Sequence, residues 1–286
     1  MNHIRAAVDR SRGPEGETAG EIGAHVPDAR EAHRWLEGHL DPVLGLVEES
    51  VAGADVEAAA VLLARVWSVV PLVPVEQTWL DRLRDCGARL AERHPGSPVV
   101  AESFRRSAAV LFDRGEYRAA EVDGMRELAV WRRLDDLDGL DRALRSLGAT
   151  FRRRGRLHRV IDCADEALAA HLRHGDPRGI ARALCDLGSI MLEVGSVDTA
   201  VDYPKRAGQA HDGLADATAE ELAAHAVLLG RALWSSGSEI NARRQFRRAR
   251  AVLVDAGADA AAIHRVDRLV DLPGGADLPD RDPDHP

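Results

Sequence analysis

The segment Leu229–Ala249, LGRALWSSGSEINARRQFRRA, contains the pattern that decides the fold of this 286-residue chain. An apolar run ends in Leu-Gly, a turn glycine follows, and a small residue stands five positions after that glycine. The turn glycine recurs along the chain with gaps of 40, 40 and 42 residues, at Gly115, Gly155, Gly195 and Gly237. A fixed period of this length indicates a stacked repeat protein, in which each repeat packs on its neighbours. We therefore expect the function to depend on a binding surface and not on a catalytic pocket.

The residues around each turn glycine recur with it. The upstream run ends in a dipeptide that is Leu-Gly in three copies: Ser107-Ala108, Leu147-Gly148, Leu187-Gly188 and Leu229-Gly230. The downstream small residues are Ala120, Val160, Ala200 and Ala242. A glycine can adopt the left-handed conformation that ends a helix without steric cost. Each copy is therefore predicted to be a helix A and a helix B joined by a tight turn, whereas an irregular bundle would not share one register.

The composition supports an all-α protein. Apolar residues make up 45% of the chain but aromatic residues only 4%, so the core must be built from Ala, Leu and Val. No alternating strand pattern of useful length is present. Helices are predicted near 29–39, 42–51, 55–70, 75–93, 98–114, 117–134, 138–154, 157–173, 178–194, 197–212, 217–236, 239–255 and 259–271. The predicted fold is a right-handed superhelical solenoid of antiparallel helix pairs with a period of about 40 residues.

The sequence divides into five segments. Residues 1–28 are predicted to be a flexible N-terminal lead, and residues 272–286 a disordered tail rich in Pro, Gly and Asp. Residues 29–97 form helix pairs without a clean signature, and residues 98–256 form four repeats that start near 101, 141, 181 and 223. A capping helix is expected at 257–271.

The last copy resembles the tetratricopeptide repeat (TPR), whose signature runs from Leu-Gly through a turn to alanine, an aromatic residue and alanine. It has these features at Leu229-Gly230, Leu233, Gly237, Ala242, Phe246 and Ala249. The third copy departs at the aromatic position, where Pro204 follows Tyr203. Proline inside helix B removes a hydrogen bond, so we expect it to kink or shorten that helix. The resemblance implies TPR-like helix pairs, longer than those of the commonest TPR period of about 34 residues.

Residues 31–255 show a narrower resemblance, to the C-terminal sensor half of the STAND-type regulatory ATPases common in actinobacteria. It rests on the segment EAHRWLEGHLDPVLGLVEE at 31–49, a degenerate helix pair and the repeats that follow. In that family the repeats restrain or release a nucleotide-binding switch. The chain has no GxxxxGK[ST] loop, so the resemblance implies a sensor or scaffold and transfers neither ATPase activity nor DNA binding. It implies a protein or peptide partner, for which a regulatory ATPase or a transcription factor acting in trans is a candidate.

The bulk composition argues against several classes of function. The formal charge is −9, whereas a nucleic-acid-binding domain carries a basic footprint. Three cysteines, Cys86, Cys163 and Cys185, lack the spacing of a metal site or a disulfide framework. No secretory signal is present in residues 1–28, and no apolar stretch is long enough to span a bilayer. We therefore expect a cytoplasmic protein that needs no metal or other cofactor and no membrane.

The sequence contains no catalytic motif: GxGxxG, HExxH and GxSxG are all absent. His171 and His174 share one helix face and could hold a metal weakly. We favour the alternative that they lie at a helix end, where cationic side chains interact favourably with the helix dipole. The chain is therefore predicted not to be an enzyme.

The TPR resemblance implies that helix A lines a concave wall at its second, fifth, ninth, twelfth and thirteenth positions. In this chain these positions are rich in arginine around the second repeat, with an aromatic residue on either side. The candidate peptide-binding residues are Arg105, Phe112, Arg142, Arg145, Arg152, Arg182, Arg231 and Trp234. Guanidinium groups bind carboxylate or phosphate with paired hydrogen bonds, and aromatic side chains anchor apolar groups. We expect a groove for an acidic, partly apolar peptide.

Three alternatives remain open from the sequence. The wall could be merely solvated, with its arginines neutralised by Asp138, Asp141 or Asp186. The basic surface at 152–159 could serve a nucleic-acid-associated regulator, which would bind with a steep salt dependence. The chain could also be a self-association module that forms a homo-oligomer, which a concentration-dependent mass would reveal.

Overall fold

The computed structural model describes residues 38–211, 214, 216–274 and 278. Within these residues the chain forms twelve α-helices and one 3-10 turn and no strand, which confirms the all-α prediction. It divides into two compact units, Met1–Arg154 and Gly155–Pro286, and the boundary falls at the turn of the second predicted repeat. Most of the helix predicted near 29–39, the lead at 1–28 and nearly all of the tail at 272–286 lie outside the described residues.

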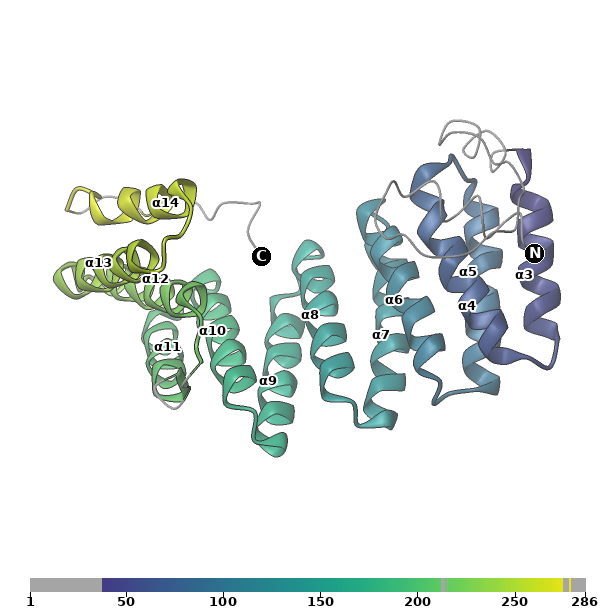
Figure 1. The fold of residues 1–286 in the computed structure, drawn as a ribbon, viewed down its shortest axis with the longest axis horizontal. Coiled ribbons are helices and arrows are strands. Elements are labelled where there is room, and N and C mark those ends of the chain that lie inside the picture. Colours follow the sequence, from purple (N-terminus) through teal and green to yellow (C-terminus); the bar gives the residue numbers. More distant parts are fainter. Residues whose placement is uncertain (1–37, 212–213, 215, 275–277, 279–286) are drawn as a thin grey trace. The chain divides into compact units, whose positions relative to one another are not determined.

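The first unit consists of helices that pack side by side as antiparallel neighbours (Figure 1). They are α3 (Leu40–Ala52), α4 (Val56–Val69), η1 (Val70–Leu72), α5 (Gln77–Arg93), α6 (Pro98–Asp113), α7 (Tyr117–Leu134) and α8 (Leu137–Arg153). The core between α3, α4 and α5 is continuous and includes Trp67, Leu44, Leu63 and Leu80, each at most 1% exposed. Burial of such side chains is the main force that holds helix pairs together, because isolated helices of this length are marginal in water.

The second unit consists of six further helices. They are α9 (Leu157–His174), α10 (Pro177–Glu193), α11 (Val197–His211), α12 (Ala219–Ser235), α13 (Glu239–Asp255) and α14 (Ala260–Val270). The helix pairs α10–α11 and α12–α13 pack closely, and α14 packs against α13 (Figure 1). Small residues lie at the contacts, since Ala200, Ala207, Ala242 and Ala249 are fully buried. These buried alanines agree with the prediction of a core built from Ala, Leu and Val.

The helix ends follow the sequence signals closely. Every described helix begins and ends within two residues of its predicted bounds. At the start of α6 the Ser97 side chain accepts a hydrogen bond from the Val100 amide at 3.4 Å, and proline occupies the first helical position. At the start of α10 the Asp176 carboxylate accepts from the Arg178 amide at 3.1 Å. Both satisfy helix N–H groups that would otherwise lack a partner.

The turn glycines adopt the left-handed conformation that their pattern predicted. Their φ angles are 77° at Gly115, 68° at Gly155, 74° at Gly195 and 77° at Gly237. A side chain in this region would meet the following carbonyl, which costs about 1–2 kcal/mol. The repeated glycine therefore has a local cause, because it closes each helix A and reverses the chain.

Pro204 does not shorten its helix, so of the two effects expected from the sequence, a kink or a shorter helix, the shortening is absent. Helix α11 continues from Val197 to His211 with Pro204 inside it. The ring packs against α10 at Gly188, where an added Cβ would lie 2.8 Å from the proline Cδ. His225 on α12 lies 2.7 Å from the Pro204 carbonyl oxygen through its Nε2 atom. Tertiary contacts on both sides thus hold the proline-containing helix in place.

Candidate functional site

The wall positions of α6 and α8 in the first unit are all accessible to solvent. We call this set the arginine face; it comprises Glu102, Arg105, Ala109, Phe112 and Asp113 of α6 with Arg142, Arg145, Ala149, Arg152 and Arg153 of α8. Each of these residues is at least partly exposed. Five carry a guanidinium group and two carry a carboxylate.

The helix period produces this face. Phe104 and Leu111 on α6 are buried, and so are Leu144 and Phe151 on α8. Because an α-helix turns every 3.6 residues, burying one stripe leaves the positions between these residues on the opposite side. The same apolar pattern that builds the core therefore turns the arginines outward.

Phe112 joins α6 to the end of α8. The Arg153 guanidinium carbon lies 6.0 Å from the centre of the Phe112 ring, a distance suited to a cation–π interaction. Tyr117 packs against the same ring edge-on, with the ring centres 5.3 Å apart. Phe112 is therefore held between two side chains and remains partly exposed.

Near the start of α6, the Glu102 carboxylate neutralises part of the positive charge of the arginine face. Arg105 donates two hydrogen bonds of 2.6 Å to its carboxylate, and Arg106 donates a third of 2.8 Å. Arg106 also donates to the Ser68 hydroxyl on α4. Although burial alone would raise the pKa of Glu102, the hydrogen bonds from Arg105 and Arg106 lower it below its ordinary value. Glu102 is therefore ionised at neutral pH and partly neutralises Arg105.

Arg142 is held differently, by stacking on an indole ring. Its guanidinium carbon lies 5.6 Å from the centre of the Trp131 ring on α7. The Trp131 Nε1 atom donates a 3.2 Å hydrogen bond to Glu127 Oε1, one turn earlier on the same helix. Gly139 makes room for the ring, because an added Cβ would lie 2.3 Å from it.

Glu127 is a buried carboxyl group directly behind the arginine face. Its side chain is 1% exposed, and Oε2 has no hydrogen-bond partner among the described residues. Burial raises its pKa to about 7, against the opposing effects of the Trp131 hydrogen bond and of the Arg105 and Arg142 charges. The sequence analysis missed Glu127; the available signal was an acidic residue at a position that the helical period places in the core.

Arg145 pairs within its own helix. It donates a 3.1 Å hydrogen bond to the Asp141 carboxylate, which is 6% exposed. This pairing matches the neutralisation considered from the sequence. Arg152 is exposed and lies one residue before Arg153 on the same face.

The candidates in the second unit do not form a comparable face. Arg182 is exposed on α10 and Arg231 is half-buried on α12. Trp234 is 8% exposed, so the expectation that it offers an open apolar anchor is wrong. It packs with Phe246 and Leu269, and Leu272 and Leu278 pack against this cluster. The large apolar side chain at this wall position is therefore buried in a cluster to which C-terminal residues of the chain also contribute.

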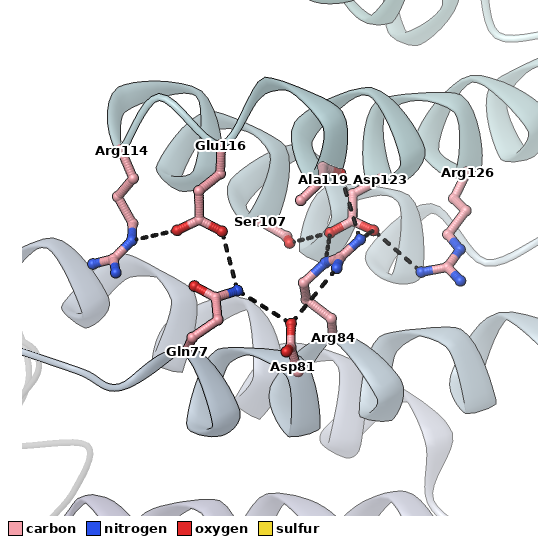
Figure 2. Close-up of polar contacts among 9 residues, drawn as sticks. All are labelled: Gln77, Asp81, Arg84, Ser107, Arg114, Glu116, Ala119, Asp123 and Arg126. Atoms are coloured by element: carbon pink, nitrogen blue, oxygen red, sulfur yellow. Dashed lines mark hydrogen bonds and ion pairs between the residues drawn. The ribbon is translucent and has the colours of Figure 1, made fainter.

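A buried polar network ties α5, α6 and α7 together on another part of the first unit (Figure 2). The Asp123 carboxylate, 1% exposed, accepts from Arg84 on α5 at 3.0 and 3.2 Å and from Ser107 on α6 at 2.5 Å. Arg126 donates a further bond of 3.1 Å. Around it, Gln77 donates to Glu116 at 3.1 Å. Every oxygen of Asp123 is satisfied within the protein, so this network is suited to holding helices and not to binding a ligand.

The described residues contain no group of three or more His, Cys, Asp or Glu side chains placed to hold a metal ion. His171 is buried and lies 2.9 Å from the carboxylate of Asp176, the residue that caps α10. It lies in the last turn of α9, as the sequence analysis predicted, and its contact with Asp176 joins α9 to α10. Burial raises the pKa of the Cys86 thiol, and burial raises the pKa of Cys185 to about 12.

Among the described helices, none is both long enough and apolar enough to cross a membrane.

No family model and no curated protein matches the chain. Comparison with solved structures defines the class of fold as a TPR-like helical repeat. BtubC (BKLC) from P. vanneervenii is 14% identical with a TM-score of 0.55, over 80% of this chain and 93% of that one. The TPR-like repeats of a putative kinesin light chain from Podosopora anserina are 13% identical with a TM-score of 0.52, over 78% and 98%. At these identities the likeness concerns the fold, and it confirms the predicted TPR-like architecture.

A STAND protein with a tetratricopeptide repeat sensor from Pyrococcus horikoshii also aligns with the chain. It is 12% identical with a TM-score of 0.46, over 84% of this chain and 41% of that protein. A TM-score at this level carries no argument about function.

Proposed function

We propose that the chain is a protein-interaction scaffold whose arginine face binds an acidic, partly apolar peptide segment. The observation that carries this proposal concerns Arg142 and Arg153. Each is held over an aromatic ring, and neither forms a hydrogen bond or ion pair with another described residue. A cation–π contact restrains the position of a guanidinium group while its N–H groups stay available for a carboxylate. The face therefore presents two oriented anion-binding groups.

The spacing of these two groups limits the ligand. Eleven residues separate Arg142 from Arg153 on one helix, which corresponds to about 16 Å at a rise of about 1.5 Å per residue. An extended peptide covers about 3.3 Å per residue and its side chains alternate between two sides, so two acidic side chains about four or six positions apart would face the two arginines. Between them the face offers Ala109, Ala149 and the partly exposed Phe112, which suit apolar side chains.

The local charge also favours an anionic partner. The arginine face has five guanidinium groups and two carboxylates, in a protein whose overall formal charge is −9. Glu102 and Asp141 neutralise Arg105 and Arg145 in part. Arg142 and Arg153 therefore account for much of the remaining positive field on this face. Such a field raises the association rate of an acidic partner and is weakened by salt.

The test uses fluorescent synthetic peptides with two glutamates separated by three to eight positions and with leucine and phenylalanine between them. Binding to the full chain is measured by anisotropy at low and physiological salt. We expect the tightest binding at about four or six positions, because these separations place both glutamates on one side of the peptide. The double variant Arg142→Glu with Arg153→Glu should weaken it by at least about tenfold, since a charged hydrogen bond contributes about 1.5–3 kcal/mol.

A matched control reverses two arginines outside the face. Arg118 and Arg133 are exposed on α7, so Arg118→Glu with Arg133→Glu makes the same change in net charge. This variant should bind like the wild type. Equal weakening of peptide binding by both double variants would show that binding depends on the overall charge of the protein and not on the arginine face, and would contradict the proposal. Binding of duplex DNA or RNA with a steep salt slope, without binding of the peptides, would favour the nucleic-acid alternative.

A further inference from the structure

Glu127 has no structural reason to be acidic. It is 1% exposed, and one of its oxygens accepts from the Trp131 indole while the other has no partner among the described residues. A buried carboxylate with an unpaired oxygen is costly, whereas a protonated carboxyl group or a glutamine would bury no charge. The residue is therefore a candidate for a role beyond packing.

The charged groups around Glu127 belong to the arginine face. From α6 they are Arg105 and Glu102, and from α8 it is Arg142. On α7 itself the only partner of the carboxyl group is Trp131, the ring on which Arg142 stacks. Glu127 thus lies behind the guanidinium groups that the proposed ligand would contact.

We infer that the arginine face takes up a proton at Glu127 when it binds an acidic ligand, so that ligand affinity falls as Glu127 ionises. This inference rests on the proposed function, because it concerns the same face. When Glu127 is neutral, Arg142 has no buried negative charge behind it. When Glu127 is ionised, its charge attracts Arg105 and Arg142 and repels an incoming carboxylate. Since a ligand anion favours the protonated form, protonation must favour the ligand equally.

The coupling would act near neutral pH, because Glu127 changes its protonation state in that range. The pKa of Glu127 is raised to about 7, so small changes around neutrality alter its charge. Glu102 does not titrate in the same range, because its arginine partners lower its pKa. At an effective dielectric constant of about 20, two unit charges about 12 to 16 Å apart interact by an amount that corresponds to about a fivefold to tenfold change in affinity.

The experiment uses inorganic sulfate, whose charge is constant between pH 5.5 and 8.0. Sulfate binding to the full isotope-labelled chain is followed by the amide signals of Arg142 and Arg153 in NMR spectra. We expect the dissociation constant of the wild type to be about fivefold higher at pH 8.0 than at pH 5.5. Glu127→Gln, which mimics the neutral carboxyl group, should bind at both pH values as the wild type does at pH 5.5.

The outcomes separate this inference from the proposed function. Absence of sulfate binding at both pH values would overturn the anion site itself, and with it both proposals. Binding that is lost in Arg142→Glu with Arg153→Glu but is equal at both pH values would overturn only the proton coupling. An unchanged pH dependence in Glu127→Gln would assign the coupling to another group and overturn the inference. If Glu127→Gln does not fold, the side-chain carboxyl carbon signal of Glu127 is titrated in the wild type with and without sulfate. Sulfate should raise its titration midpoint, and an unchanged midpoint would overturn the inference.

Discussion

Arg84 on α5 and Asp123 on α7 form an ion pair through two hydrogen bonds, although 39 residues separate them in the sequence. That separation is about one repeat. Trp79 donates to the Leu40 carbonyl across 39 residues at 3.1 Å, and Arg106 donates to Ser68 across 38. Side-chain hydrogen bonds thus connect equivalent positions of successive helix pairs in the first unit. They fix the register of the stack in addition to the apolar core.

The Arg84–Asp123 pair should be essential for stability. Asp123→Ala would leave Arg84 and Ser107 without their acceptor in a buried site, and we expect a loss of about 3–5 kcal/mol in the free energy of unfolding. Chemical denaturation followed by circular dichroism would measure it. The comparison variant is Arg82→Ala, because Arg82 forms a similar two-bond pair with Glu48 but is half exposed. That change should have little effect on stability. A similar loss from both variants would show that burial of the pair is not the cause.

Gly230 should tolerate no larger residue. An added Cβ would lie 2.4 Å from the Phe246 ring, so Gly230→Ala must displace the ring or separate α12 from α13. We expect a destabilisation of about 1–3 kcal/mol despite the better helix propensity of alanine. Gly45 in α3 has no atom near its Cβ position, so Gly45→Ala should stabilise by about 0.5–1 kcal/mol. Thermal melting of both variants tests the prediction, and a stabilising Gly230→Ala would contradict it.

Glu127 should make stability depend on pH between its unfolded and folded pKa values. Its folded pKa is about 7 and its ordinary value is 4.5, so between these pH values the folded state holds a proton that the unfolded state has lost. Stability contributed by this group is therefore full below pH 4.5 and falls as the pH rises towards 7. The loss approaches about 3 kcal/mol.

Glu127→Gln should remove this slope, because a glutamine side chain does not titrate. Urea unfolding at a series of pH values from 5 to 8, for both proteins, would give the difference. The variant should be more stable than the wild type at pH 8 and nearly equal to it at pH 5. Parallel pH profiles for the two proteins would show that Glu127 is not buried as a neutral group.

Arg243 should hold the C-terminal helix in place. It donates to the carbonyl oxygens of Val270 and Leu272, and it stacks 5.2 Å from the Trp234 ring centre. Arg243→Ala should therefore increase hydrogen exchange in α14 by about tenfold or more, corresponding to about 1–2 kcal/mol of local stability. Arg247 is exposed on α13, the helix that also carries Arg243, and Arg247→Ala serves as the control with no expected change. Unaltered exchange in α14 would show that its apolar contacts suffice.

The sequence by itself determined the fold class and nearly every helix boundary. The reason is local. Gly115 and its equivalents end their helices because glycine adopts the positive φ that the turn requires. The spacing of the apolar residues determines which side of each helix is buried. The TPR resemblance supplied the outward positions of α6 and α8, and the helical period explains why residues opposite a buried stripe face solvent. These features need only the conformational preferences of neighbouring residues.

The tertiary structure alone decided which outward residues are open and which acidic residues are buried. Trp234 occupies a predicted wall position but is covered by Leu272 and Leu278, which no local pattern indicates. Glu127 and Asp123 are both acidic and both buried on α7, yet one is almost unpartnered and the other is saturated by Arg84, Ser107 and Arg126. Their difference arises from side chains on other helices, because the charge state and availability of a group depend on what lies within a few ångströms in space.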